Sequence, residues 1–162
     1  MKQIALTKGY VTIVDDEDYE SLSRHKWHVM VTKTGNAYAV RLVTRDGKQR
    51  AVLMHRQITG APKGSHVDHA NRNSLDNRRQ NLRPCSSSQN ASNHCKQRGT
   101  WSSRYKGVSW SSRAGKWRAY IVVQTKFKHL GYFDTENEAA LTYNRAAKKH
   151  FGEFALPNDI AA

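Results

Sequence analysis

Residues 66–94 decide the fold of this chain, and they read HVDHANRNSLDNRRQNLRPCSSSQNASNH. Asp68 and His69 place a carboxylate beside an imidazole after a short apolar approach. Adjacent residues of an extended segment point to opposite faces, so both side chains reach one site only at a strand end or a bend. The Asn- and Arg-rich segment behind them is typical of a loop, and residues 81–84 favour a second strand.

A short helix is expected after this second strand. Ser87 or Ser88 can cap its first turn. Asn90 and His94 would then lie four residues apart on one face of the helix. The stretch therefore predicts a strand, a loop, a second strand and a helix, folded around one metal ion.

Residues 53–94 resemble the HNH endonucleases, especially those of phage and intron mobile elements. The residues that carry the resemblance keep the order and spacing of that family: Asp68-His69, Asn77, Asn81-Leu82 and Gln89-Asn90. The resemblance implies a ββα-metal nuclease that cuts DNA phosphodiester bonds. Some branches of the family have His where this chain has Asn90, a difference that bears on the choice of metal.

Hydrolysis of a phosphodiester needs an activated water, and a neutral imidazole with a pKa of about 6.5 is the usual general base at neutral pH. We assign that role to His69. The second catalytic residue is Asn81, whose side chain we expect to bond the backbone or His69 and so to fix the orientation of the imidazole. His55 either belongs to the same site or is a buried structural histidine.

A divalent cation can polarise the phosphate and stabilise the departing 3′ alkoxide. Asp68 and the amide of Asn90 offer hard oxygen ligands, which suit Mg²⁺ or Mn²⁺ better than a soft metal. His94 is a candidate third ligand, with a solvated histidine at a helix end as the alternative. Zinc is the weaker choice, because Cys85 and Cys95 are too few for a four-cysteine site. A cluster of Cys85, Cys95 and His94 could bind zinc in principle, but two ordinary thiols in a reducing cytosol are the simpler interpretation.

Excess positive charge is spread along the whole chain, with a net charge of +14 and a pI of about 10.1. This excess favours a polyanionic partner, and mixed, solvated surface charge is the alternative. The sequence has no run of eighteen apolar residues and no signal-peptide pattern, which predicts a cytoplasmic protein without a membrane partner. We expect no small-molecule organic cofactor, and the oligomeric state stays open.

Residues 1–95 are expected to form one domain, in which a small antiparallel lead-in packs on the nuclease core at residues 53–95. Weak alternation over residues 3–14 with a turn at Lys8-Gly9 predicts a hairpin. Strands are expected over residues 27–31, 37–43 and 51–54, and a short helix over residues 55–59. The acidic residues 15–18 are typical of a helix start or a solvated run, rather than of a metal site.

Residues 96–104 are basic and aperiodic, which predicts a mobile linker that follows the DNA backbone. Residues 105–110, 117–123 and 126–133 then predict three strands. Thr135 and Glu138 form a capping-box pattern, and small or apolar residues at helical spacing continue to Phe151, with Gly152 as the stop. Three strands and one helix leave one face of the sheet covered and the other free.

Residues 105–157 resemble the apetala-two or ethylene-response-factor DNA-binding domain of plants. The stretches that carry the resemblance are YKGV at 105–108, WRA at 117–119, LGYF at 130–133 and AALTYNRAA at 139–147. In that family the free face of the sheet enters the major groove. Strand alternation places Ala119 and Ile121 toward the helix, and leaves Arg118, Tyr120 and Val122 for DNA.

Several further side chains are candidates for nucleic-acid contact: Arg83, Arg104, Lys106, Arg113, Lys116 and His129. The chain departs from the plant pattern at Val122 and His129, so the plant target sequence is not carried over. Trp117 is expected to pack in the core of this domain.

Together these features predict an α+β protein that acts as a site-directed endonuclease of the homing type on double-stranded DNA in the cytoplasm. The resemblance suggests a phage or another mobile element as its source, and for a phage-encoded protein this is the cytoplasm of the host cell. The alternative is a non-cleaving DNA-binding transcriptional regulator, which would have no need of the spacing of Asp68, His69 and Asn81. An RNA-directed nuclease or binder is a third possibility. It is disfavoured because the sequence suggests no exposed aromatic pair like that of an RNA-recognition motif.

Overall fold

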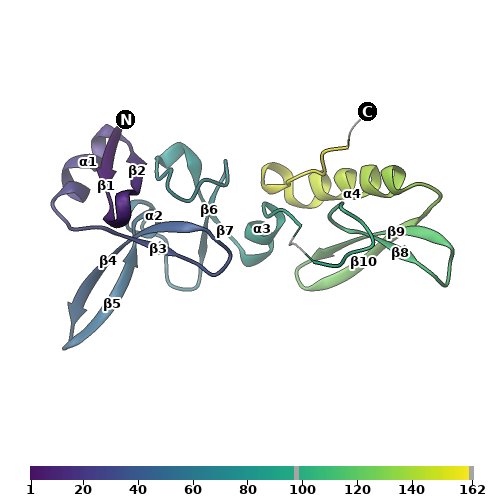
Figure 1. Ribbon diagram of the computed structural model, residues 1–162, viewed down its shortest axis with the longest axis horizontal. Coiled ribbons are helices and arrows are strands. Elements are labelled where there is room, and N and C mark those ends of the chain that lie inside the picture. Colours follow the sequence, from purple (N-terminus) through teal and green to yellow (C-terminus); the bar gives the residue numbers. More distant parts are fainter. Residues whose placement is uncertain (97–98, 161–162) are drawn as a thin grey trace. The chain divides into compact units, whose positions relative to one another are not determined.

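The computed structural model describes residues 1–96 and 99–160, and the chain divides into two compact units, Met1–Ser86 and Ser87–Ala162 (Figure 1). Both units combine helices with antiparallel sheets, which confirms the predicted α+β class. No helix of the described residues is both long and apolar enough to cross a membrane.

The first unit begins with a hairpin of β1 (Lys2–Ala5) and β2 (Val11–Val14), joined through the 3-10 turn Thr7–Gly9. Lys8 and Gly9 both have positive φ angles, so the predicted hairpin and its turn are confirmed. The next elements are helix α1 (Asp16–Ser23) and strands β3 (His28–Val31), β4 (Ala37–Arg45) and β5 (Lys48–Leu53). These three strands form an antiparallel sheet, followed by helix α2 (Met54–Thr59).

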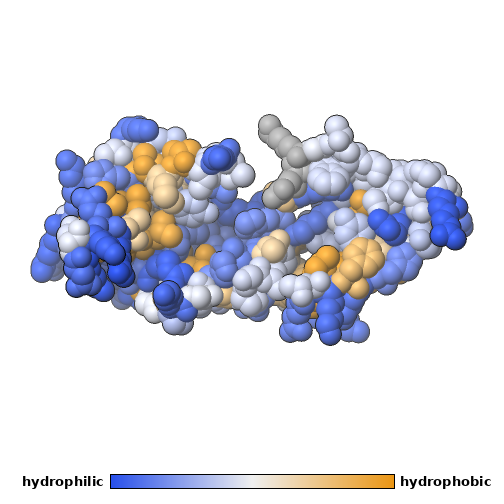
Figure 2. Space-filling view, turned by 90° about the horizontal axis from the view of Figure 1, so that it is seen from below, coloured by the Kyte–Doolittle hydropathy of each residue, from blue (hydrophilic) through white to orange (hydrophobic). Residues whose placement is uncertain are grey.

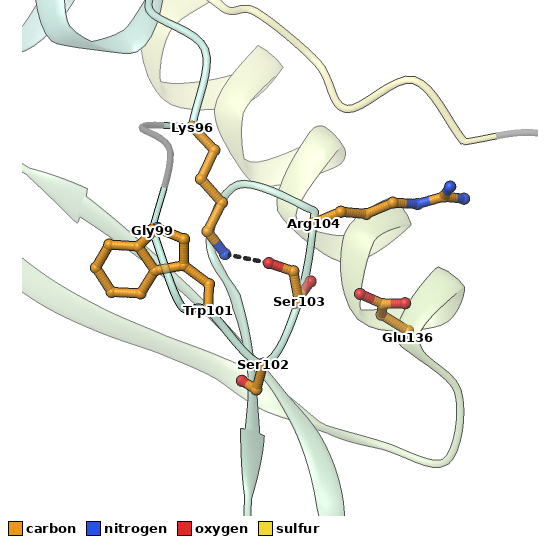
Figure 3. A pocket seen from close by; sticks show the side chains of 7 residues that line it. All are labelled: Lys96, Gly99, Trp101, Ser102, Ser103, Arg104 and Glu136. Atoms are coloured by element: carbon orange, nitrogen blue, oxygen red, sulfur yellow. Dashed lines mark hydrogen bonds between the residues drawn. The ribbon is translucent and has the colours of Figure 1, made fainter.

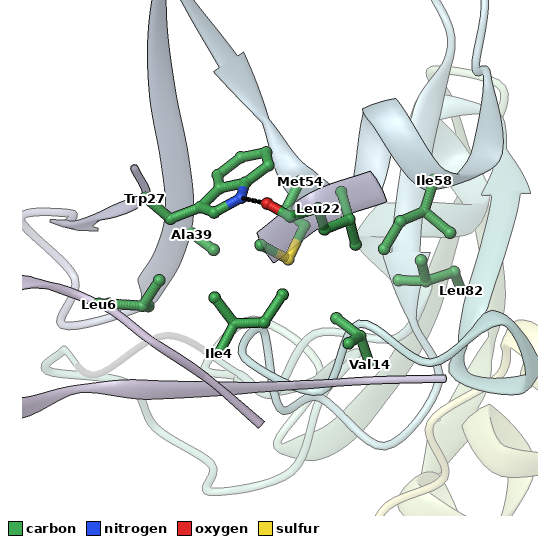
Figure 4. Close-up of a cluster of buried hydrophobic side chains, with 9 residues drawn as sticks. All are labelled: Ile4, Leu6, Val14, Leu22, Trp27, Ala39, Met54, Ile58 and Leu82. Carbon is green, nitrogen blue, oxygen red and sulfur yellow. Dashed lines mark hydrogen bonds between the residues drawn. The ribbon is translucent and has the colours of Figure 1, made fainter. Parts of the chain in front are cut away.

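Apolar side chains from several elements meet in the core of the first unit (Figure 4). Val14, Leu22 and Met54 are almost completely buried, and they come from β2, α1 and α2. Trp27 is also buried, and its Nε1 donates to the carbonyl oxygen of Leu22 at 2.8 Å, which satisfies the polar atom of the indole. Leu82 joins the same cluster and so ties the chain beyond the Asn-rich loop to the lead-in.

The motif stretch forms a second antiparallel hairpin, made of β6 (His66–His69) and β7 (Leu82–Cys85). Asp68 stands opposite Arg83, and His69 stands opposite Leu82. The loop between the strands ends in the 3-10 turn Arg79–Asn81. The predicted strand, loop and strand are therefore present, with the Asp68-His69 pair at the end of the first strand.

Strand β2 is hydrogen-bonded to the middle of the loop between β6 and β7. The backbone N–H of Ile13 donates to the carbonyl oxygen of Leu75 at 2.9 Å. The backbone N–H of Asn77 donates back to the carbonyl oxygen of Ile13 at 2.8 Å. These two bonds make the N-terminal hairpin a support for the loop that follows His69.

The second unit contains a sheet with one helix laid across it (Figure 1). The sheet is antiparallel in the order β10-β9-β8. The elements of the unit are α3 (Ser87–Ser92), β8 (Val108–Ser111), β9 (Lys116–Val123), β10 (Lys126–Phe133), α4 (Glu136–Phe151) and the 3-10 turn Gly152–Phe154. The three predicted strands and the long helix are confirmed.

Helix α4 starts and packs as its sequence indicates. The hydroxyl of Thr135 accepts from the backbone N–H of Glu138, and the carboxylate of Glu138 accepts from the backbone N–H of Thr135, which is a complete capping box. Ala139 and Ala140 are fully buried against the sheet, where their small side chains allow a close approach. Gly152 follows the last helical residue, as predicted.

Helix α3 is shorter than the sequence suggested. It ends at Ser92, so His94 lies beyond it, and the predicted helical face shared by Asn90 and His94 is wrong. The physical reason is the ammonium group of Lys106, which donates to the carbonyl oxygens of Ala91, Ser92 and His94. These carbonyls are satisfied by a side chain instead of by a further helical turn.

Residues 96 and 99–104 pack within the second unit, which differs from the predicted mobile linker (Figure 3). The ammonium group of Lys96 donates to the carbonyl oxygens of Ser103 at 2.9 Å and Tyr105 at 2.8 Å. Ser103 is buried, and its hydroxyl accepts from the backbone N–H of Tyr105. The boundary between the two units falls after Ser86, ahead of this segment. Residues 97 and 98 of the predicted linker lie outside the described residues.

Candidate active site and nucleic-acid interface

Asp68 and His69 lie at the end of β6, and both are buried, with 4% and 6% of their surface exposed. The carboxylate of Asp68 accepts a hydrogen bond from the guanidinium of Arg83 directly across the hairpin. The pair neutralises a carboxylate that would be costly to bury alone. Arg83 is therefore engaged inside the site, whereas the sequence suggested a contact with nucleic acid.

Asn77 holds the ring of His69, with its Oδ1 3.3 Å from Nε2 of the imidazole. Burial lowers the pKa of His69, and the hydrogen bond with Asn77 and the charges of Asp68 and Asp76 oppose that shift. The imidazole is therefore neutral at neutral pH, which is the form that a general base needs.

Asn81 organises the loop through bonds to its backbone. Its Oδ1 accepts from the backbone N–H of Asn71 at 2.9 Å, and its Nδ2 donates to the carbonyl oxygen of Asp76 at 2.7 Å. Of the two roles expected for Asn81, the structure shows the bond to the backbone, while Asn77 makes the contact with His69. The presence of Asn77 in the motif was the sequence signal for this second role.

A buried carboxylate tightens the same loop. Asp76 accepts from Nη2 and Nε of Arg78 at 2.6 and 2.8 Å, and from Nδ2 of Asn71 at 2.8 Å. These donors, led by Arg78, hold the pKa of Asp76 below its usual value. The loop that follows His69 is thus closed by ionic and amide bonds as well as by β2.

The acidic residues at the start of α1 bind the turn before β7. Arg79 places Nη2 2.6 Å from Oδ1 of Asp18 and Nε 2.9 Å from Oε1 of Glu17, while its backbone N–H donates to Asp15. Asp15, Glu17 and Asp18 are the one group of three possible His, Cys, Asp or Glu ligands that lie close together among the described residues. The predicted helix start at the acidic run is confirmed, since α1 begins at Asp16.

Two aromatic side chains form a wall beside the imidazole of His69. The ring of His55 on α2 packs edge-on at a centroid distance of 5.2 Å, and Tyr38 on β4 lies at 6.3 Å. Burial, followed by the charge of His69, lowers the pKa of His55 to about 4. Burial and the charge of Asp68 raise the pKa of Tyr38. His55 is a buried histidine packed on the site, and Tyr38 went unnoticed in the sequence because it arrives from a separate strand.

The donors available for a metal ion are hard ligands. Asp68 offers a carboxylate in the first unit, and Asn90, half-buried on α3, offers an amide oxygen in the second. His94 is exposed just beyond α3. A carboxylate and an amide oxygen fit Mg²⁺ or Mn²⁺ better than zinc.

Comparison with known proteins agrees with this geometry. The profile of a family described as HNH endonuclease matches residues 51–92, a range that spans β6, the Asn-rich loop, β7 and α3. An uncharacterised HNH endonuclease of Acanthamoeba polyphaga mimivirus is 31% identical over 159 residues, which cover 94% of this chain and 77% of the relative. The chain belongs to the HNH endonuclease family. Membership supports a nuclease, that is, a hydrolase.

In this HNH endonuclease, α4 leaves one face of the β8–β10 sheet uncovered (Figure 1). Ala119 and Ile121 are buried, and Trp117 packs against the core, as the strand alternation predicts. Arg118 lies on the free face, where its Nη2 donates to the hydroxyl of Ser109 at 3.2 Å. Its guanidinium also lies over the ring of Tyr120 at 5.5 Å.

Aromatic side chains gather around Arg118 on the free face. Tyr120 and Phe127 stack at a centroid distance of 5.0 Å, and His129 contacts Tyr132 at 4.6 Å. Phe127 and Tyr132 are 55% and 48% exposed. Figure 2, seen from below Figure 1, shows hydrophobic patches bordered by hydrophilic residues on the surface of the HNH endonuclease. The expectation of no exposed aromatic pair is therefore wrong, because the pairing of β9 with β10 joins residues that are separated in the sequence.

The remaining basic candidates differ in what they already bind. Arg104 and Arg113 are exposed, and Lys116 forms a surface ion pair with Asp134 at 2.9 Å. Lys106 is half-buried, and burial lowers its pKa to about 8. Its ammonium group donates to three carbonyl oxygens at the end of α3, so Lys106 supports the fold, and the DNA contact that the sequence suggested for it stays a prediction.

The HNH endonuclease is also similar to plant proteins over 51 of its residues. An AP2-like ethylene-responsive transcription factor of Arabidopsis thaliana is 45% identical over this segment, which covers 32% of this chain and 10% of the relative. APETALA2-like protein 2 of Oryza sativa subsp. japonica is also 45% identical over 51 residues, which cover 32% of this chain and 12% of the relative. The matched segment is thus about a tenth of each plant protein.

Proposed function

We propose that this HNH endonuclease is a site-directed DNA endonuclease of the homing type, with His69 as the general base. The observation that carries the proposal is the buried Asp68-His69 pair at the end of β6, with the ring of His69 held by Asn77. A protein that only binds DNA has no need of an oriented, neutral imidazole beside a buried carboxylate. The similarity to a viral HNH endonuclease over nearly the whole chain agrees with this proposal.

The reaction requires one proton transfer at His69. The imidazole takes a proton from a water molecule, and the resulting hydroxide oxygen bonds to phosphorus. The bond from phosphorus to the 3′ oxygen then breaks, and the 3′ oxygen leaves with the electron pair and takes a proton from a solvent water molecule. Because the ring of His69 is buried between Asn77, His55 and Tyr38, the imidazole needs little reorientation when it takes the proton from the water.

We propose that Asp68 and Asn90 hold a divalent cation, Mg²⁺ or Mn²⁺, with His94 as a third ligand. Such an ion would polarise the phosphate and stabilise the negative charge on the leaving oxygen. The order and spacing of Asp68 and Asn90 in the sequence, which resemble those of the family, support this assignment. Arg83 would compensate the charge of Asp68 in the absence of the ion.

We further propose that the free face of the β8–β10 sheet binds double-stranded DNA in the major groove. Arg118 and Tyr120 lie on that face, and Arg104, Arg113 and Lys116 offer positive charge to phosphates. Binding of the second unit to DNA raises the effective concentration of the nuclease unit near its target. The net charge of +14 supports a polyanionic partner. A phage or other mobile element acting in a host cytoplasm is the setting that we propose.

Cleavage of supercoiled plasmid DNA tests the catalytic proposal. Purified protein with Mg²⁺ or Mn²⁺ is expected to convert plasmids that carry a random-sequence library to the open-circle or linear form. EDTA and the substitution His69→Ala should both abolish conversion, because they remove the metal and the base. His25→Ala, which removes an exposed histidine of the same unit, should leave the rate unchanged.

Either of two results would contradict this proposal. Full activity of His69→Ala would exclude His69 as the base. Absence of any conversion across the library, with DNA binding intact, would favour the non-cleaving transcriptional regulator instead.

A second candidate function for the second unit is stacking on single-stranded nucleic acid. The observation that favours it is the cluster on the free sheet face of half-buried Tyr120 with the exposed rings of Phe127 and Tyr132. Bases stack on such aromatic platforms, and each contact contributes roughly 1–3 kcal/mol. A direct comparison of duplex and single-stranded ligands distinguishes the two candidates.

A further inference from the structure

A chain of buried polar groups runs from the first hairpin to the imidazole of His69. The hydroxyl of Thr12 on β2 donates to the carbonyl oxygen of Leu75 at 2.7 Å. The hydroxyl oxygen of Thr12 in turn accepts from Nδ2 of Asn77 at 2.7 Å, and Oδ1 of Asn77 lies 3.3 Å from Nε2 of His69. Thr12 and Asn77 are 0% and 1% exposed, so bulk water does not replace any partner in this chain.

The position of each proton follows from the chemistry of the groups. A carbonyl oxygen has no proton to give, so the only hydroxyl proton of Thr12 lies toward Leu75. The oxygen of Thr12 must then accept from Asn77, which turns the amide nitrogen toward Thr12 and the amide oxygen toward His69. Because an amide oxygen only accepts, Nε2 of His69 carries the proton of the neutral ring, and Nδ1 carries none.

The opposite orientation of the Asn77 side chain, with Oδ1 and Nδ2 exchanged, is disfavoured by the same contacts. It would place Oδ1 of Asn77 against the oxygen of Thr12 at 2.7 Å, with no proton between two acceptors. The other acceptor near the hydroxyl is Sδ of Met54 at 4.0 Å, and a thioether at that distance is a weak partner beside a carbonyl oxygen at 2.7 Å. The orientation of Asn77 is thus set by the partners of Thr12.

We propose that Thr12, acting through Asn77, is a positioning residue that keeps His69 protonated at Nε2, so that Nδ1 is the nitrogen that accepts the proton of the attacking water. This inference rests on the proposed role of His69 as general base. The backbone bonds between Ile13 and the segment from Leu75 to Asn77 keep the donor and acceptor in register. The N-terminal hairpin is therefore part of the catalytic apparatus, and not only a cover for the core.

Imidazole ¹⁵N spectra of the metal-free protein test the proposal without any cleavage assay. Protonated and unprotonated ring nitrogens give distinct signals, so the spectrum of the neutral ring identifies the tautomer. The wild-type protein is expected to show His69 protonated at Nε2. A wild-type ring protonated at Nδ1 would overturn the proposal, whatever the behaviour of any variant.

Substitutions at Thr12 separate the hydroxyl from the shape of the side chain. Thr12→Val should give a mixture of tautomers and lower kcat by roughly 10- to 100-fold with little change in KM, because Asn77 is no longer oriented. Thr12→Ser retains the hydroxyl and should restore both the tautomer and most of kcat. Thr59→Val is the matched control, since it removes a hydroxyl bond of 2.8 Å to a carbonyl oxygen of α2 that does not reach the ring of His69.

A folded Thr12→Val variant with the wild-type tautomer and the wild-type kcat would refute the role of Thr12. If Thr12→Val does not fold, Thr12→Ser and the wild-type spectrum still decide the question. If the wild-type protein cleaves no DNA, the proposed nuclease function fails, while the spectrum still reports the tautomer.

Discussion

The two histidines that face each other at the candidate site differ in their polar partners. His69 has Asn77 at Nε2 and the charge of Asp68 nearby, and both counteract the effect of burial on its pKa. For His55, burial, His69 and Arg56 all act in the same direction and lower the pKa to about 4. At the scale of single residues, these partners support our proposal of His69, rather than His55, as the general base.

The low pKa of His55 predicts a loss of stability of the first unit in mild acid. The unfolded chain protonates this histidine near its ordinary pKa of 6.5, whereas the folded chain resists protonation until about pH 4. The unfolded state therefore binds more protons between these values, and the free energy of unfolding falls as the pH is lowered from about 6.5 to about 4. The loss due to His55 is on the order of 3 kcal/mol.

Denaturant unfolding, followed by NMR signals of the first unit at several pH values, measures this effect. His55→Phe keeps an aromatic ring but cannot titrate, so its stability should decline less than that of the wild-type protein between pH 6.5 and 4. His25→Phe replaces an exposed histidine of the same unit, and it is the control. Its free energy of unfolding should keep the pH dependence of the wild-type protein. Parallel curves for His55→Phe and the wild-type protein would show that His55 is not held neutral.

At the scale of elements, local sequence signals were sufficient to predict many of the helices and strands. The capping box at Thr135 and the alternation of Ala119 and Ile121 predicted the start of α4 and the buried face of β9 correctly, because such signals depend on neighbouring residues alone. The end of α3 was not predictable in this way. It depends on Lys106, whose ammonium group arrives from a segment beyond the helix.

Gly107 precedes β8 and lies close to the side chain of Tyr143 on α4 and to the backbone of β9. It has a φ of +71°, and a Cβ added there would overlap the ring of Tyr143 and the carbonyl oxygen of Tyr120. Gly107→Ala is therefore expected to destabilise the second unit by about 3 kcal/mol or more, from overpacking together with backbone strain. Thermal unfolding followed by signals of the second unit measures the loss.

Gly115→Ala is the matched control for this prediction. Gly115 also has a positive φ, of +60°, but nothing lies within 4 Å of an added Cβ. Only backbone strain applies there, at about 1–2 kcal/mol. Equal losses for the two variants would mean that the contact of Gly107 with Tyr143 carries no weight.

At the scale of the whole molecule, the two units offer different chemistry to one polymer. The first unit contains Asp68 and His69, while the second presents Arg118 and an aromatic face. The positive charge is not confined to either unit, since Lys and Arg together number 27 against 13 Asp and Glu. We therefore expect long-range attraction to nucleic acid from the entire chain and discrimination from the free sheet face.

Binding measurements over a range of salt concentrations test this division of roles. The affinity for duplex DNA should fall steeply with salt, because each contacted phosphate releases counterions. Arg118→Ala should weaken the binding of a preferred duplex by about 1–3 kcal/mol if Arg118 contacts a base, and should reduce the salt slope by about 1 if it contacts a phosphate. Arg145→Ala, which removes an exposed arginine from α4, is the control and should have little effect.

The same assay with single-stranded ligands evaluates the stacking alternative. Phe127→Ala should then weaken single-strand binding more than duplex binding, because the variant lacks the exposed ring on which a base would stack. If Arg118→Ala and Phe127→Ala leave the affinity for every ligand unchanged, the free face of the sheet does not bind nucleic acid.

The sequence alone determined the family, the α+β class, most strands and helices, and the Asp68-His69 pair, because these depend on short-range spacing and on local backbone preferences. The tertiary structure decided which groups those residues meet. Asn77 and not Asn81 contacts His69, Arg83 pairs with Asp68, and Thr12 reaches the imidazole through Asn77. These contacts join segments that are distant in the chain, and no local pattern encodes the geometry by which packing brings them together.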